Sequence, residues 1–398
     1  MIQPERNRLF SSLATIALLL TVGCTSNTTP PPAGPTIPPP PTAKIRPQAT
    51  IGAGEGQLAL IAVDGYLDDS WVKPFVDQTG CKIIPKFVGP SDEMVSLMKD
   101  GGGGTYDMVA APGDVGLRLV YDGNVKPMNT ALIPDWANFH PYFKDPPFNT
   151  IGGIHFGISL QWGPNTLLFN TRKFPNAPTS WNVIYDPANK GLITVPDNAM
   201  QIADAALYLS KTQASLGIKD PYELTKKQFD AAVALLKQQK PLIKEYWALP
   251  AQEISMFQNG QVFVGAASTY QTVQLRVAGA TIAETIPTEG ATGWADTWML
   301  ATKAPHPNCA YLWTRWISTA KVQAQQALFF GETPVNTKAC AEMEGLSAGS
   351  CGAYHGNAGA AYLDSIKFWK TPLAICPDGT SNCIPFEQWQ TGWASVKS

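Results

Sequence analysis

The stretch that runs LALIAV (58–63), SWVKPFV (70–76), KIIPKFV (82–88), SDEMVSLM (91–98) and YDMVA (106–110) decides the fold. Three of these segments are short apolar runs with the length of buried strands, as a parallel sheet requires. The two segments between them carry helical signals, and the second begins with a capping serine followed by two acids and apolar residues at helical spacing. The order β, α, β, α, β predicts a doubly wound α/β unit.

The middle of the chain adds two more elements. Asp220-Pro-Tyr-Glu223 places a helix cap, a proline in the first turn and a glutamate three residues after the cap, and Pro241 follows an apolar face. We therefore expect a helix that begins at Asp220 and stops before Pro241. Residues 261–266, Gln-Val-Phe-Val-Gly-Ala, predict another buried strand.

Length and charge narrow the function classes. Four of the 29 basic and two of the 31 acidic residues lie in the first 56 of the 398 positions, which leaves a net charge of −4 for the remainder. That balance argues against a surface built mainly for nucleic acid or for an anionic membrane. The remainder, about 340 residues, exceeds the size at which one core stops growing, so two compact units are expected. It contains no apolar run as long as a membrane span.

The N-terminus has the features of a secretion signal. Arg6 and Arg8 precede an apolar run at residues 13–20, and Gly23 lies directly before Cys24. A charged segment, an apolar segment and a small residue at the cleavage site follow in the order of a signal peptide. A short buried helix is the alternative, but it would not need a lone cysteine at this place.

The cleavage region also resembles the bacterial lipobox. Residues 20–24 read Leu-Thr-Val-Gly-Cys, although Thr21 stands where leucine is usual. The resemblance implies a signal peptide over residues 1–23 and lipidation of Cys24. It places the protein in the cell envelope outside the cytoplasmic membrane, periplasmic or on the cell surface, held by an N-terminal lipid.

A proline-rich segment follows the lipid-attachment cysteine. Residues 30–41 contain eight prolines and no charge, and such a composition favours extended polyproline II over a packed core. We interpret residues 24–56 as a tether outside the folded protein. A PxxP peptide ligand is the alternative use of this composition.

The cysteines also indicate export. Six remain after Cys24, and an even number outside the cytoplasm favours disulfides, with fifteen conceivable pairings. The spacings favour two local bridges and leave one residual pair: Cys340 with Cys351, Cys376 with Cys383, and Cys81 with Cys309. A zinc site is the competing interpretation, but the sequence has no C-x-x-C and its four histidines lie far from paired cysteines. We expect no metal and no cofactor.

An ordered series of short motifs identifies a family resemblance. The motifs are Gly104-Thr-Tyr-Asp-Met-Val-Ala110, Gly157-Ile-Ser-Leu-Gln-Trp-Gly163 with Leu168-Phe-Asn170, Thr179-Ser-Trp181, Asn189-Lys-Gly-Leu-Ile193, Arg276-Val-Ala-Gly279, Pro287-Thr-Glu-Gly290 with Trp294-Ala-Asp296, and Gly331-Glu-Thr-Pro-Val-Asn336. From about residue 57 to about 340 the chain resembles the spermidine/putrescine-binding branch of bacterial ABC-transporter solute-binding proteins.

The resemblance implies a two-lobe α/β protein of the periplasmic-binding-protein type, with a ligand cleft between the lobes. The chain would cross between lobes three times. Lobe one would take residues 57–161 and 291–335, and lobe two would take residues 162–290 and 336–398. The partners implied are a small solute, a membrane permease and its ATPase, with no nucleic acid, and we expect a monomer.

A polyamine site needs carboxylates for its ammonium groups and aromatic walls for its methylenes. By resemblance, Trp294 would pack on the ligand chain and Asp296 would pair with an amine; the alternative is a core tryptophan and a turn-capping aspartate. Tyr66 stands at an aromatic position of the first strand-to-helix loop. Asp114 lies near a ligand-contacting tyrosine of the family, and a helix cap is its alternative role.

Other positions depart from the family. By resemblance, Val63 replaces the family's first-loop tryptophan, and a residue near Ser268 replaces the tryptophan at a strand end of lobe two. Asn198 and Gln201 take the place of an acidic pair, and Asp197 would restore one acid by a shift of one residue. Because an unpaired ammonium group is costly in a cleft, these changes also fit a smaller amine, an amino acid, an opine or a sugar conjugate.

Catalytic motifs are weak by comparison. Gly345-Leu-Ser-Ala-Gly349 matches G-x-S-x-G, but no apolar strand precedes it and no acid lies between Ser347 and His355. Neither the four glycines at 101–104 nor the Gly-rich residues 52–56 have the Lys-Ser/Thr of a phosphate loop. We therefore expect a binding protein and not an enzyme. A secreted glycoside hydrolase, suggested only by the 12 Trp and many carboxylates, is the alternative from another class.

Overall fold

The computed structural model describes residues 38–89, 91–376 and 379–398. By internal contacts the chain divides into two units, Met1–Gly34 and Pro35–Ser398, and every described residue belongs to the second. The predicted signal peptide over 1–23 and the lipidation site Cys24 lie outside the described residues.

One large mixed sheet runs through the described part of the chain. Its strands are β1 (Gln57–Ala62), β2 (Lys82–Phe87), β3 (Met108–Ala111), β6 (Ile158–Asn170), β7 (Ile193–Pro196), β8 (Ile243–Trp247), β9 (Val264–Ser268), β10 (Ile282–Thr285), β11 (Ala291–Leu300), β12 (Thr333–Pro334) and β13 (Ile366–Phe368). The order along the sheet is β2-β1-β3-β11-β6-β9-β7-β8, with β10 and β12 on β6 and β13 on β11. A separate hairpin pairs β4 (Thr150–Ile151) with β5 (Ile154–His155).

The first α/β unit forms as the sequence predicts. Strand β1 pairs in parallel with β2 and β3, and helices cover both faces of these strands. The covering helices are α1 (Asp69–Thr79), α2 (Ser91–Met98), α3 (Gly113–Tyr121) and α8 (Pro307–Ile317). Leu58 and Leu60 pack with Trp71 of α1 and Trp313 of α8, whereas Ile61 packs on the opposite face. This alternation is the doubly wound arrangement. Helix α1 ends at Gly80, which takes the left-handed conformation at φ 71°.

A second set of helices surrounds β7, β8 and β9. These are α4 (Gln201–Thr212), α5 (Lys226–Gln239), α6 (Pro250–Gln258), α7 (Thr269–Val277) and α13 (Phe386–Lys397). Helices α4, α5 and α13 share one apolar core, to which α13 contributes the fully buried Trp389. The C-terminal helix is therefore a structural part of this half of the molecule.

Two element boundaries differ from the sequence prediction. Helix α5 begins at Lys226 and not at Asp220, because Thr225 and Gln228 form a reciprocal capping box while Asp220 accepts a hydrogen bond from the Tyr222 N–H in a turn. The strand predicted at 261–266 is β9, which begins at Val264 because the Gln261 N–H closes the end of α6.

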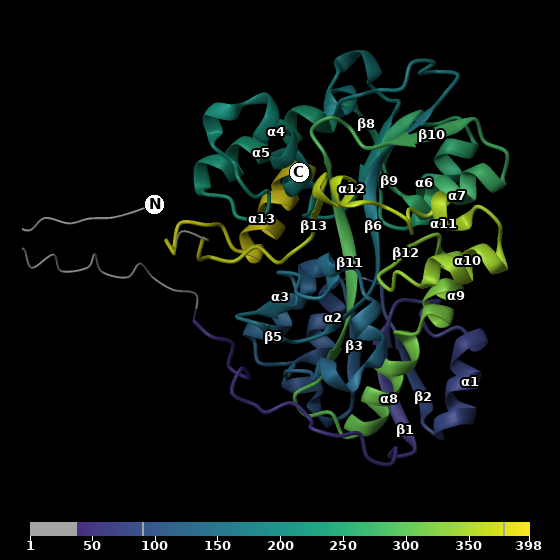
Figure 1. The fold of residues 1–398 in the computed structure, drawn as a ribbon. Coiled ribbons are helices and arrows are strands. Elements are labelled where there is room, and N and C mark those ends of the chain that lie inside the picture. Colours follow the sequence, from purple (N-terminus) through teal and green to yellow (C-terminus); the bar gives the residue numbers. More distant parts are fainter. Residues whose placement is uncertain (1–37, 90, 377–378) are drawn as a thin grey trace, which may run out of the picture. The chain divides into compact units, whose positions relative to one another are not determined.

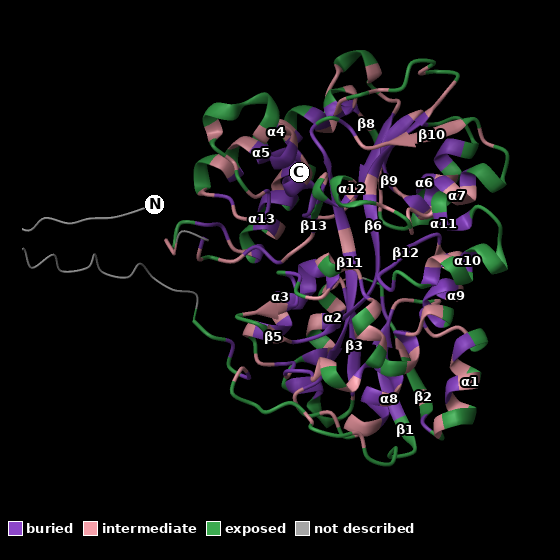
Figure 2. Cartoon of the chain, viewed as in Figure 1, coloured by how far each residue is buried: buried purple, intermediate pink, exposed green. Residues whose placement is uncertain are grey.

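Strands β6 and β11 connect the two sets of elements. Figure 1 shows them running side by side through the middle of the sheet, and Figure 2 shows both buried along most of their length. The first part of β6 pairs with β11, and its second part, from Asn165 to Phe169, pairs with β9. Strand β11 is interrupted by an irregularity in register between Ala295 and Thr297. The predicted Trp-x-Asp motif lies at this interruption.

The remaining α-helices lie between α8 and β13 in the chain. They are α9 (Ala320–Phe330), α10 (Ala339–Leu346), α11 (Ser350–Ala353) and α12 (Ala360–Asp364). None of the helices within residues 38–89, 91–376 and 379–398 has the combined length and apolar character of a membrane span. Ser347 is the residue that ends α10, so a helix and not a strand precedes it, and its local structure is not that of a nucleophile elbow.

Three disulfides join the predicted cysteine pairs. Two close short local loops, and the third links the residue directly before β2 to α8 across a sequence separation of 228: Cys340–Cys351, Cys376–Cys383 and Cys81–Cys309.

The described end of the predicted tether packs on the folded domain. Thr42 is 5% exposed, and its hydroxyl donates a hydrogen bond of 2.7 Å to the Val125 carbonyl. The Glu55 carboxylate accepts hydrogen bonds from the backbone N–H groups of Asn308 and Cys309 at 2.9 and 2.8 Å. These N–H groups lie in the first turn of α8 and have no partner within the helix, so Glu55 acts as its cap. The prediction that residues up to 56 lie outside the folded protein is wrong for this segment.

Candidate functional site

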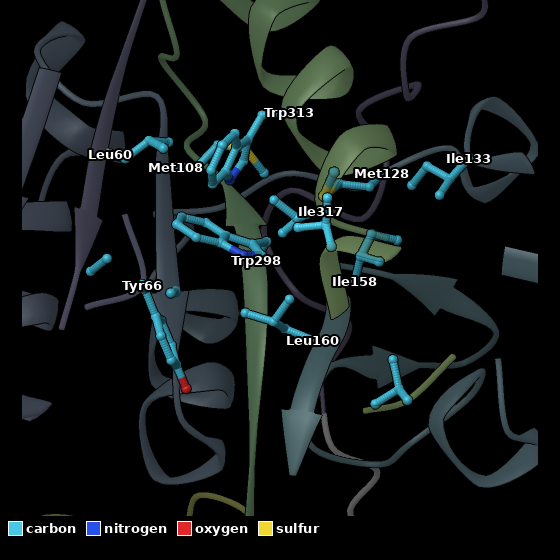
Figure 3. Packing of buried hydrophobic residues seen from close by; sticks show 14 of the residues in the cluster. Leu60, Tyr66, Met108, Met128, Ile133, Ile158, Leu160, Trp298, Trp313 and Ile317 are labelled. Carbon is cyan, nitrogen blue, oxygen red and sulfur yellow. The ribbon is translucent and has the colours of Figure 1, made fainter. Parts of the chain in front are cut away.

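Tyr66 and Asp296, which are 230 residues apart in the sequence, meet at the centre of the molecule. Tyr66 lies in the loop after β1, and its hydroxyl donates a hydrogen bond of 2.5 Å to Oδ2 of Asp296 on β11. The two side chains are 2% and 8% exposed. The tyrosine ring packs edge-on against Phe330 at 4.9 Å, and Figure 3 shows its hydroxyl pointing away from the packed core. The structure thus joins two residues of the predicted site.

Glu332 is a third member of this group, and the sequence did not single it out as a ligand-binding residue. It lies between α9 and β12 and is 8% exposed. Strand β12 pairs with β6 so that Thr333 lies opposite Trp162, and continuing this antiparallel register places Glu332 opposite Gly163. Oε2 of Glu332 is buried and has no hydrogen-bond partner among the described residues.

Trp294 of β11 pairs with the same residue of β6, Gly163. A Cβ atom added to Gly163 would lie 2.7 Å from the Trp294 indole. The indole therefore covers Gly163, which has no side chain to keep it away. Trp294 stays partly exposed, so it is not a core tryptophan. Because neighbouring strands are about 4.8 Å apart, Glu332, Gly163 and Trp294 form one row across β12, β6 and β11.

Asp114 approaches the group from the first turn of α3. It is 5% exposed, its Oδ1 has no hydrogen-bond partner among the described residues, and it is not the residue that caps the helix. The segment after β13 holds the start of this helix in place. The Thr371 hydroxyl donates to the Asp114 carbonyl at 2.9 Å, and a Cβ atom at Gly113 would collide with the Trp369 carbonyl oxygen.

Burial raises the pKa values of the carboxyl groups in this group of residues. The pKa of Asp296 rises to about 7, mainly by burial and further through the negative charge of Asp114, against the stabilising Tyr66 hydrogen bond. The pKa of Asp114 rises to about 6 by burial, with Ser91 and Arg118 acting in the opposite direction. Burial and the nearby Asp296 raise the pKa of Glu332 well above its usual value. A cationic group placed among these carboxylates would stabilise their charged forms.

Asn198 and Gln201 lie at the start of α4, and their side chains have hydrogen-bond partners other than Tyr66 and Asp296. The Asn198 side chain accepts a hydrogen bond from the Met200 N–H at 2.9 Å, and Gln201 donates to Asp204 at 2.6 Å. The suggested substitute Asp197 is occupied elsewhere, because its carboxylate accepts from the Trp393 indole at 2.9 Å and pairs with Lys397 at 2.6 Å. The structure therefore rules out Asp197 as a free replacement for the lost acids.

The two other departures from the family pattern have structural roles. Val63 is partly buried and packs against the cores on both faces of the first unit. Ser268 is the cap of α7, where it forms a reciprocal box with Gln271. No aromatic wall is expected from either residue.

Two cavities lie outside this group of residues. A cavity of about 130 Å³ is lined by Tyr142, Pro147, Asp220, Tyr222, Leu363, Asp364, Ile366, Lys367, Phe368 and Lys370. An open one of about 600 Å³ is lined by Lys99, Asp100, Gly101, Asp122, Gly123, Asn124, Thr302 and Lys303. Neither is lined by Tyr66, Asp296 or Glu332, whose residues are only 2%, 8% and 8% exposed.

The fold is that of a two-lobe α/β protein, and its group of buried carboxyl groups lies beside the central strands β6 and β11. Comparisons with known proteins specify the class. Residues 70–347 match the family of bacterial extracellular solute-binding proteins, and the chain belongs to that family. It is therefore a binding protein and not an enzyme, and the glycoside hydrolase alternative is not supported.

Individual relatives agree with this assignment. The spermidine/putrescine-binding periplasmic protein of Escherichia coli (strain K12) is 22% identical over 275 residues, which is 69% of this chain and 76% of that protein. The spermidine/putrescine ABC-transporter substrate-binding protein of Streptococcus pneumoniae superposes with a TM-score of 0.68 at 18% identity, covering 86% of this chain and 97% of that one. A glucopine-bound periplasmic binding protein of A. tumefaciens gives a TM-score of 0.61 at 16% identity, covering 86% of this chain and 100% of that one. At these identities the structural matches show the fold.

Glu332 and Asp204 are not among the predicted site residues, although the sequence contained weak signals for both. Glu332 lies inside the last of the quoted motifs, directly after the glycine that ends α9. Asp204 lies one helical turn after Gln201, where residues three apart share a face. Neither signal shows which other residues these acids lie near, because that depends on how the strands pair in the fold.

Proposed function

We propose that this protein is the substrate-binding component of an ABC importer and captures a small cationic amine. The observation that carries the proposal is the Asp296–Glu332 pair. Both carboxylates are buried near each other, a tyrosine donates to one of them, and no cation pairs with either among the described residues. An unpaired buried charge is costly, and an ammonium group beside the Trp294 indole would remove that cost through ion pairing and cation–π contact.

The names of relatives support an amine as the solute. The E. coli and S. pneumoniae proteins are described as binding or transporting spermidine and putrescine. Carboxylates beside an indole suit a polyamine, whose ammonium groups alternate with methylene segments. We therefore infer a polyamine-like or other small amine solute.

We infer that capture occurs by hinge closure between two lobes. The proposed lobes are residues 57–161 with 291–335 and residues 162–290 with 336–398. The boundaries lie within β6, at the start of β11 and directly after β12, and β6 pairs with β11 where the lobes meet. A small change in these two shared strands would move one lobe against the other. The closed form would then deliver the solute to a membrane permease and its ATPase, and a lipid on Cys24 would keep the protein in the envelope outside the cytoplasmic membrane.

A second candidate solute is a polar metabolite such as an opine or an amino acid. The neutral Asn198 and Gln201 favour it, because amide groups suit hydroxyl and carboxylate partners, and the glucopine-bound structure has the same fold. The two candidates differ in their dependence on Asp296, which pairs with an ammonium group but repels a carboxylate.

Calorimetry and thermal unfolding test the proposal. The purified protein is titrated with putrescine, spermidine, agmatine, γ-aminobutyrate and an opine. A true ligand stabilises the fold by about 2.7 kcal/mol at a hundredfold excess over Kd, and no product forms. Asp296→Asn should weaken amine binding by more than tenfold, about 1.4 kcal/mol. Binding of the opine alone, unaffected by this substitution, would replace the amine proposal with the second candidate.

A further inference from the structure

Asp204 on α4 is a further carboxylate without a cation, and its residue is partly buried. Its Oδ1 accepts a hydrogen bond of 2.5 Å from the Thr292 hydroxyl, and its Oδ2 accepts one of 2.6 Å from the Gln201 amide. Asn165 on β6 donates in turn to the Thr292 oxygen at 2.7 Å, which orients the threonine hydroxyl toward Asp204. The ion pairs among the described residues do not include Asp204.

Protein surrounds the Asp204 side chain, but the residue keeps some exposure to solvent. Protein surrounds the carboxyl group, and this burial raises its pKa to about 7 against the Thr292 hydrogen bond. Tyr185 and Tyr222 lie near enough to feel its charge. The residue nevertheless stays partly exposed, unlike its α4 neighbours Gln201 and Ala205. A group that is both surrounded and accessible can receive a ligand.

Strand β11 places Asp204 in line with the proposed amine site. Three residues of β11, each two positions after the last, make the relevant contacts. The Thr292 hydroxyl donates to Asp204, the Trp294 indole lies over Gly163, and Asp296 accepts the hydrogen bond from Tyr66. Thr292 and Trp294 share a face of the strand because side chains alternate. Four residues of strand span roughly 13 Å, somewhat less with the irregularity after Ala295. The result is a carboxylate, an indole and a second carboxylate along one strand.

We propose that Asp204 is a second cation-binding residue of this site and makes it selective for linear diamines over monoamines. The inference rests on the proposed function and specifies it. One ammonium group would pair with Asp296 and Glu332, the methylene chain would lie on Trp294, and the other ammonium group would pair with Asp204. A ligand with a carboxylate at its far end would meet the negative charge of Asp204 and bind weakly.

The test compares putrescine with butylamine, which replaces one ammonium group by a methyl group. Isothermal titration of the wild-type protein at pH 8 should show at least a tenfold preference for putrescine. Asp204→Asn keeps the size of the side chain and removes its charge. It should weaken putrescine binding by more than tenfold and leave butylamine within about twofold. Asp230→Asn on α5, an exposed aspartate paired with Lys226, is the matched control and should change neither affinity.

The outcomes separate this inference from the proposed function. If the wild-type protein binds neither amine, the proposed function fails. If it binds both equally, or if Asp204→Asn weakens both equally, amine binding stands and the role of Asp204 is overturned. Should Asp204→Asn not fold, Asp204→Glu decides, because it keeps the charge and extends it by one methylene toward the ligand. It should shift the preferred diamine to a shorter one, and an unchanged order of diamine affinities would overturn the proposal.

Discussion

Solute binding should release protons, and its affinity should rise from pH 6 to pH 8. In the free protein the pKa of Asp296 is about 7, because burial and Asp114 disfavour its charged form. An ammonium ligand needs the charged carboxylate, so binding pulls this pKa down. The ligand amines keep their protons over this range, since their pKa values lie near that of lysine. The groups that face Asp296 are Tyr66, Asp114 and Glu332.

The size of the effect follows from the pKa of Asp296. A group that must lose a proton weakens binding by a factor of 1 + 10^(pKa − pH), which is about 11 at pH 6 and about 1.1 at pH 8 for a pKa of about 7. The association constant should therefore increase about tenfold between these two values. Release of a second proton from Glu332, whose pKa is raised further, would make the dependence steeper.

Titration calorimetry measures this linkage directly. Putrescine binding is followed at pH 6, 7 and 8 in two buffers of different ionisation enthalpy, and the difference in heat gives the number of protons released. About half a proton per ligand is expected from Asp296 at pH 7. Asp296→Asn should remove this contribution and lose most affinity at pH 8, where the wild-type carboxylate is charged. An affinity that stays constant or falls from pH 6 to pH 8 would refute the assignment of Asp296 to the amine site.

Three further outcomes test the geometry around this site. Gly163→Ala should displace the Trp294 indole and weaken amine binding by more than tenfold in calorimetry. The control is Gly345→Ala, because Gly345 lies in a helix and has open space around it. This control should leave binding unchanged and stabilise the fold by about 0.5–1 kcal/mol. Glu55→Ala should lower the unfolding free energy by about 1 kcal/mol without changing affinity, because it removes the cap of α8. Without ligand, the free energy of unfolding should fall as pH rises from 4 to 7, because the folded state keeps a proton on Asp296 that the unfolded chain releases near pH 4. Denaturant titrations should show a loss of up to about 4 kcal/mol from this residue. Asp296→Asn should flatten the dependence of the unfolding free energy on pH.

The first α/β unit could be predicted from local pattern. Its strands are apolar runs of the right length, and the helix between the first two ends at Gly80 because glycine accepts the left-handed conformation there. The three cysteine pairs could also be predicted, since two of them close short loops. The helix predicted at Asp220 was placed too early because two adequate caps compete there, and the reciprocal Thr225–Gln228 pair satisfies more backbone groups.

For the site, the sequence by itself determined the family resemblance and two residues, Tyr66 and Asp296, that the structure brings into contact. Only the tertiary structure places Glu332 near Asp296 and joins Asp204 to Thr292 of β11. A buried glutamate and an exposed one have the same local sequence signature, and the difference arises from the pairing of β12 with β6 and from the hydrogen bond of Thr292 to Asp204. These are contacts between residues far apart in the chain, so their electrostatic consequences exist only after the strands have been aligned.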